Sequence, residues 1–72
     1  MPLVQIDVFE NELTAEQSRS LIAKITAAVT DVTSDRLREA TWVIINEVKD
    51  KHWGVGGNAL ALDDVKSIVA GD

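Results

Sequence analysis

The stretch MPLVQIDVFE, residues 1–10, alternates along its length as a half-buried β-strand does. Val4, Ile6 and Val8 are β-branched and fall on one face of this strand, which predicts that this face packs against a core. The opposite face consists of Leu3, Gln5, Asp7 and Phe9.

Pro2 directly follows Met1, the initiator methionine, which cells usually remove before a small residue. Removal leaves Pro2 with a free secondary amine, and a strand paired in a sheet holds that amine in place. A fixed amine beside apolar surface is a candidate general base or Schiff-base nucleophile. The simpler interpretation is that Pro2 only opens an edge strand, where its missing N–H does no harm. If Met1 stays attached, the Pro2 nitrogen is an amide without a basic lone pair.

A long helix and a second strand follow. Thr14 and Gln17 form the pattern of a capping box and predict a helix over residues 15–32. Residues 41–48, TWVIINEV, are rich in β-branched side chains and predict the second strand. Strand, helix and strand in this order favour an α/β fold, a βαβ unit with two parallel strands and a right-handed crossover helix. The helix's apolar stripe consists of Leu21, Ile22, Ile25, Ala28, Val29 and Val32.

Three further segments complete the chain. Residues 33–40 are polar and predict a connection between the helix and the second strand. Its Arg36 and Arg38 are either ordinary surface charges or substrate-binding groups, since a guanidinium group suits a carboxylate. Residues 49–58, KDKHWGVGGN, predict a glycine-rich hairpin turn in which at least one glycine has positive φ. Residues 62–70 predict a short helix with Asp63 as its N-cap.

Composition limits the classes of function. The 72 residues form one small domain, residues 1–72, with no cysteine and a single histidine, which excludes disulfides, thiolate metal sites and multi-histidine metal sites within one chain. The formal charge of −5 argues against nucleic acid and polybasic membrane binding as partners. With no apolar run of membrane-spanning length and no signal-peptide pattern, we expect a soluble cytoplasmic protein.

A chain of this size has a marginal core, and one helix covers only one sheet face. The other face would expose Leu3, Phe9 and Trp42 to water. Exposed apolar area of that kind marks an association surface. The sequence therefore predicts a homo-oligomer, in which two chains form a dimer with a four-stranded sheet and the uncovered faces of such dimers pack together.

The amino-terminal PLVQIDVFE, the helical LIAKITAAV and VIINEVKDKHWGVGG together resemble the 4-oxalocrotonate tautomerase family over residues 2–58, without a gap. The resemblance implies small βαβ subunits, commonly assembled as hexamers (trimers of dimers), that need no cofactor. It also implies that the amino-terminal proline moves a proton between atoms of an enol or unsaturated keto acid.

Carried over residue by residue, the resemblance makes Pro2 the catalytic base and Trp53 the pocket aromatic, usually a phenylalanine in the family. Glu12 and Trp42 stand where the best-known members have arginines, one binding a substrate carboxylate and the other polarising the keto group. Arg38 lies in the segment before Trp42 and is a candidate substitute, which the resemblance itself does not support. Since Glu12 repels a carboxylate, we expect a substrate less anionic than a diacid.

Three functions remain open at this point. The first is a tautomerase-type isomerase acting on a small carbonyl or enol compound, with Pro2 as base and with Trp42 and Trp53 shaping an apolar pocket. The second is a non-catalytic relative that binds a small molecule or serves as an assembly subunit. The third is a hydratase- or dehalogenase-type lyase that uses Pro2, with Glu12 activating water.

Overall fold

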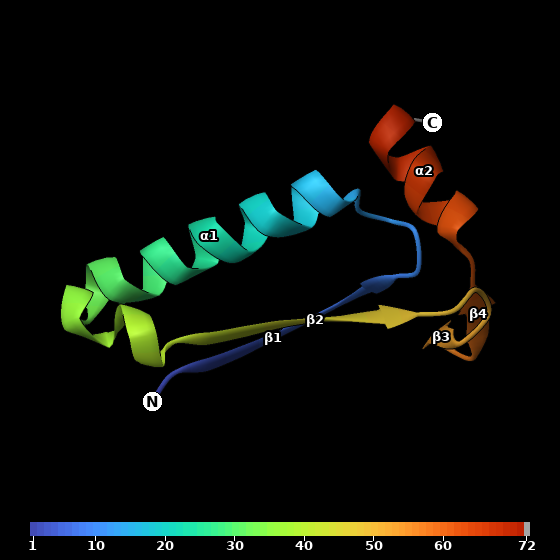
Figure 1. Ribbon diagram of the computed structural model, residues 1–72. Coiled ribbons are helices and arrows are strands. Elements are labelled where there is room, and N and C mark those ends of the chain that lie inside the picture. The colour runs from blue at the N-terminus through green and yellow to red at the C-terminus, as the bar shows by residue number, and fades with distance from the viewer. Residues whose placement is uncertain (72) are drawn as a thin grey trace.

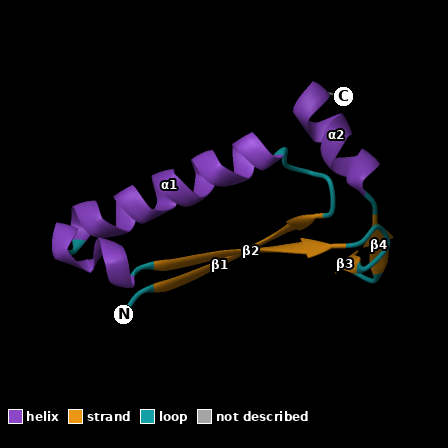
Figure 2. Ribbon diagram, in the orientation of Figure 1, coloured by secondary structure: helices purple, strands orange, loops and turns teal. Residues whose placement is uncertain are grey.

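The computed structural model describes residues 1–71 and shows an extended βαβ unit with a hairpin and a short helix added at one end (Figure 1). Figure 2 distinguishes its helices, strands and connecting loops. In chain order the elements are β1 (Leu3–Phe9), α1 (Ala15–Val32), the 3₁₀ helix η1 (Asp35–Ala40), β2 (Trp42–Val48), β3 (Trp53–Val55), β4 (Asn58–Leu60) and α2 (Leu62–Ala70).

β1 and β2 are parallel neighbours, as the sequence predicts, and their register runs from Leu3 opposite Trp42 to Phe9 opposite Val48. α1 crosses one face of this strand pair and leaves the other face without a covering element (Figure 1). Along β1 exposed and half-buried residues alternate, and Val4, Ile6 and Val8 are the half-buried ones. The alternation that predicted the strand therefore also identifies the face that packs against α1.

α1 begins and ends where the sequence predicts. The Thr14 hydroxyl accepts from the Gln17 N–H at 3.0 Å, and the Gln17 side chain accepts from the Thr14 N–H at 2.9 Å. This reciprocal pair is a complete capping box, which stabilises the first turn by satisfying two backbone donors. The connection after α1 is more ordered than predicted, because Ser34 caps η1 by accepting from the Arg36 N–H at 3.2 Å.

The glycine-rich segment forms the hairpin β3–β4, and the prediction of positive φ is confirmed at Gly56 (59°) and Gly57 (85°). Two consecutive residues with positive φ are what a two-residue hairpin loop that follows the strand twist requires. The hairpin brings Trp53 onto Phe9, with ring centroids 5.2 Å apart. The expectation that Phe9 lies in water is therefore wrong: its side chain is only 3% exposed because Trp53 covers it.

α2 spans the predicted residues 62–70, but its N-cap lies two residues before the predicted one. Its N-cap is Ala61, and Asp63 lies inside the first turn, so the prediction of Asp63 as N-cap is wrong. The Asp64 carboxylate accepts from the Ala61 N–H at 2.8 Å, and the Asp50 carboxylate accepts from the Leu62 N–H at 2.9 Å. These two carboxylates replace the missing cap side chain, because both accept from backbone donors at the start of the helix.

A single chain leaves far more surface open than a compact protein of its mass. Its accessible surface is 5516 Å², whereas a folded monomer of 7.8 kDa has about 4,400 Å². Its radius of gyration is 14.8 Å, against about 11 Å for a compact chain of this length. Among residues 1–71 only Phe9 and Thr30 are buried, each with 3% of its surface exposed, so most apolar side chains of the single chain keep contact with solvent. No helix in the same range is long and apolar enough to cross a membrane.

Candidate active site

Pro2 and Trp42 lie together at the end of the strand pair where both strands begin. The Pro2 carbonyl accepts from the Trp42 N–H at 3.0 Å, one residue before the register pair of Leu3 and Trp42. Pro2 is half-buried, whereas the Trp42 side chain is 58% exposed on the uncovered face. This hydrogen bond fixes the position of Pro2, so that its nitrogen has a defined place relative to the sheet.

Arg38 belongs to the same end of the molecule but turns toward α1. Its guanidinium donates to the Thr30 hydroxyl at 3.4 Å, a long contact to one of the two buried residues. It lines a surface hollow of about 430 Å³ between α1 and η1, together with Asp31 and Asp35. Arg38 therefore lies next to carboxylates of its own chain, and the structure does not direct its side chain into a site with Pro2.

Glu12 and Trp53 lie at the opposite end of the strand pair. The Glu12 carboxylate accepts from the Phe9 N–H at 2.9 Å, and the Glu12 N–H donates to the Phe9 carbonyl at 3.0 Å. Asn11 between them has φ 68°, a conformation that asparagine tolerates better than most residues. Glu12 thus closes the turn that ends β1, a role that the sequence analysis missed and that the Asn11-Glu12 pair could have signalled.

One chain therefore holds two separate halves of the predicted site. The seven residues of β1 lie between them, a span of roughly 20 Å at the rise of a β-strand. Within the chain the structure brings Pro2 together with Trp42, and Glu12 together with Phe9 and Trp53. It does not bring Trp53 or Glu12 to Pro2. A pocket that contains both Pro2 and Trp53 requires two chains.

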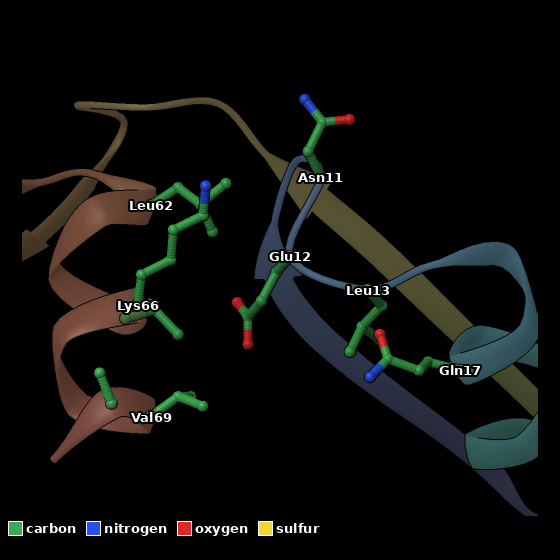
Figure 3. A pocket seen from close by; sticks show the side chains of 9 residues that line it. Asn11, Glu12, Leu13, Gln17, Leu62, Lys66 and Val69 are labelled. Carbon is green, nitrogen blue, oxygen red and sulfur yellow. The ribbon is translucent and has the colours of Figure 1, made fainter.

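Next to Glu12 lies a cavity of about 400 Å³ between the β1–α1 connection and α2 (Figure 3). Glu12 points from the connection toward α2, from which Lys66 and Val69 project on the facing side. This cavity was not predicted from the sequence, although the spacing of apolar residues in the last helix is a signal for it. The lining residues are Asn11, Glu12, Leu13, Gln17, Leu62, Val65, Lys66, Val69 and Ala70.

The chain matches one family model, described as "Tautomerase enzyme", over residues 2–62. A relative from Dickeya dadantii, named a probable tautomerase, is 40% identical over 60 residues, which are 83% of this chain and 88% of the relative.

Two solved structures are similar as well. One is YwhB, described as a homologue of 4-oxalocrotonate tautomerase: it has a TM-score of 0.72 and 35% identity, and the match covers 88% of this chain and 97% of YwhB. The other is a 4-oxalocrotonate tautomerase isozyme from Methylibium petroleiphilum, with a TM-score of 0.71, 34% identity and coverage of 81% and 90%. The chain therefore belongs to the tautomerase family.

Proposed function

We propose that the protein, once Met1 is removed, isomerises a small enol or unsaturated carbonyl compound with Pro2 as the general base. The observation that carries the proposal is the hydrogen bond between the Pro2 carbonyl and the Trp42 N–H in a chain of the tautomerase family. It holds the amine of a processed chain at a fixed place on the strand pair. Proton transfer requires such a fixed base within hydrogen-bond reach of its substrate.

The reaction needs no external reactant. The Pro2 amine takes a proton from the enol oxygen or from a carbon, the double bond shifts, and the same proton returns to another carbon. One O–H or C–H bond breaks, one C–H bond forms, and substrate and product are isomers. Apolar walls favour the neutral, basic form of the amine, because burial disfavours the charged form.

Those walls come from a second chain in our proposal. Pro2 and Trp42 of one chain meet Trp53 and Glu12 of another chain. A second chain is needed because the two pairs lie roughly 20 Å apart within one chain. The large exposed surface of the single chain supports such an assembly. A dimer with a four-stranded sheet, and a hexamer of three dimers, is the arrangement that we propose.

The substrate in this proposal is a monocarboxylate or a neutral enol. Glu12 carries a negative charge at the half-site around Trp53, and Trp42 offers a developing enolate one neutral N–H donor. A dicarboxylate would place one of its charges against Glu12, which repels it.

The test compares protein with Met1 removed and protein that retains Met1 on a panel of aryl and alkyl enols, each with one carboxylate or none. Because a general base contributes typically 10²–10⁴-fold, we expect the retained form to lose kcat by about that factor. Blocking the amine is a cleaner change than Pro2→Ala, since the alanine amine can still act as a base. Mass spectrometry establishes the state of the terminus in each sample.

Equal rates for the two forms would remove Pro2 from the mechanism. Absence of turnover by both forms on the whole panel would contradict the proposed function and favour a non-catalytic binding role.

A further inference from the structure

α2 is the part of the chain that the family match leaves unexplained. The match to the family model ends at residue 62, where α2 begins. Ile68 and Val69 are 76% and 83% exposed, whereas Leu62 and Val65 at the start of the helix are half-buried. Asp50 and Asp64 fix its first turn, which holds the helix at a set place beside the β1–α1 connection.

The cavity that α2 forms with this connection is lined by one acidic and one basic side chain. Glu12 is half-buried on one wall, and Lys66 lies on the facing wall (Figure 3). Apart from two amides, Asn11 and Gln17, the remaining lining is apolar. Lys66 lines the cavity and is exposed, so an anion that enters the cavity can reach its ammonium.

The two charged side chains, Glu12 and Lys66, suit different groups of a ligand. Glu12 already receives the Phe9 N–H on one carboxylate oxygen, which leaves its second oxygen to accept a donor such as a hydroxyl. Lys66 offers only donors and a positive charge, which suit a carboxylate. A volume of about 400 Å³ falls within the range of small-molecule pockets, ~300–1,000 Å³.

We infer that Lys66 is a specificity-determining residue, which binds the single carboxylate of a small apolar enol acid in the cavity between α2 and the β1–α1 connection. The enol hydroxyl faces Glu12, and a second carboxylate at that place would be repelled. This inference rests on the proposed function, because it assigns the substrate class of the same assembled site. α2 then acts as a wall of that site rather than as a dispensable tail.

The kinetic test uses an aryl enol carboxylate and its methyl ester, which differ in charge at one place. We expect Lys66→Gln to lower kcat/KM for the carboxylate by about three- to tenfold, the size of one solvent-accessible charged hydrogen bond, and to leave the ester unchanged. Lys66→Arg should retain the carboxylate preference. Arg19→Gln, which removes an exposed cation outside the cavity, should change neither rate.

A binding test separates the inference from the proposed function. Benzoate, which the protein cannot isomerise, should shift the NMR amide signals of residues 62–70 saturably in protein with or without Met1, and Lys66→Gln should weaken this binding. If no enol is turned over but benzoate binds in this way, the proposed function fails and carboxylate binding by Lys66 stands.

Two results would overturn the inference while leaving the proposed function intact. The first is turnover in which the ratio of kcat/KM for the carboxylate to kcat/KM for the ester is the same in Lys66→Gln and in the unmodified protein. The second is a set of α2 signals that responds to protein concentration and not to benzoate, because a neighbouring chain then fills the cavity.

Discussion

Glu12 shows at the scale of one residue how a turn and a candidate site share a side chain. Its carboxylate accepts from the Phe9 N–H at 2.9 Å and so ends β1, while its second oxygen faces the cavity beside α2. The turn requires a hydrogen-bond acceptor at this position and does not require a charge. The charge is therefore free to act on whatever occupies the cavity.

Glu12→Gln and Glu12→Ala should separate these two roles. The glutamine amide oxygen still accepts from the Phe9 N–H, so we expect the free energy of unfolding to change by less than about 0.5 kcal/mol. Alanine leaves that half-buried donor without its acceptor and should cost about 1–2 kcal/mol. Urea denaturation of both variants at one fixed protein concentration measures the difference. Equal losses in the two variants would show that the charge itself stabilises the turn.

At this scale the sequence singles out candidate residues but does not place their side chains. Pro2 could be singled out from its position after Met1 and before an alternating strand, because terminal proline and strand pattern are both local signals. That Arg38 turns toward Thr30 could not be predicted, since the contact depends on how η1 folds back on α1. The burial of Phe9 likewise depends on Trp53, which lies 44 residues later in the chain.

The hairpin β3–β4 is the element that completes the end of the strand pair. Its two-residue turn requires left-handed backbone at Gly56 and Gly57, and its first residue, Trp53, covers Phe9. Gly54 differs from these two, because it lies in β3 and an added Cβ there would meet its nearest atom, the Asn58 carbonyl oxygen, at 4.0 Å. Of the three hairpin glycines, only the two in the turn are therefore required by the backbone conformation.

Gly57→Val should destabilise the protein by about 1–3 kcal/mol, because a β-branched residue is strained at a φ of 85°. Loss of the turn should also loosen Trp53 from Phe9, which tryptophan fluorescence reports. Gly54→Ala is the matched control, and we expect it to change the free energy of unfolding by less than about 0.5 kcal/mol. A valine variant as stable as the control would show that the turn tolerates a side chain.

Helix caps set by neighbouring residues could be predicted closely, whereas those that depend on residues distant in the chain could not. The boundaries of α1 follow from Thr14 and Gln17, which contact each other across one turn. The bounds of α2 match the prediction, but its cap was wrongly assigned, because Ala61 has no capping side chain and the Leu62 N–H is satisfied by Asp50 from twelve residues earlier. Local hydrogen bonds can be read from sequence spacing, whereas a cap supplied by a distant side chain cannot.

At the scale of the whole molecule, the chain has an end that begins both strands and an end that carries the hairpin and α2 (Figure 1). Pro2 lies at the first end and Trp53 at the second. Because of this separation, the proposed catalytic site forms only where two chains meet. The accessible surface of 5516 Å² leaves room for that contact.

Mixing two inactive variants tests this arrangement. Chains that retain Met1 lack the base, and Trp53→Ala chains lack the apolar wall, so each assembly alone should have low activity. After equal amounts are dissociated and reassembled, random pairing should place an intact Pro2 beside an intact Trp53 in about a quarter of the sites. Sedimentation confirms that reassembly has occurred. If activity stays at the level of the two parents, the site lies within one chain.

The hydrogen bond between Pro2 and Trp42 also sets an order of events during synthesis. The ribosome makes Pro2 first, and Trp42 follows 40 residues later. At about 5–20 residues per second, β2 becomes available to pair with β1 only about 2–8 s after Pro2 is made. Met1 is unpaired throughout this interval. The free Pro2 amine that our proposal requires can therefore be exposed on the nascent chain, and the strand pair that holds it forms afterwards.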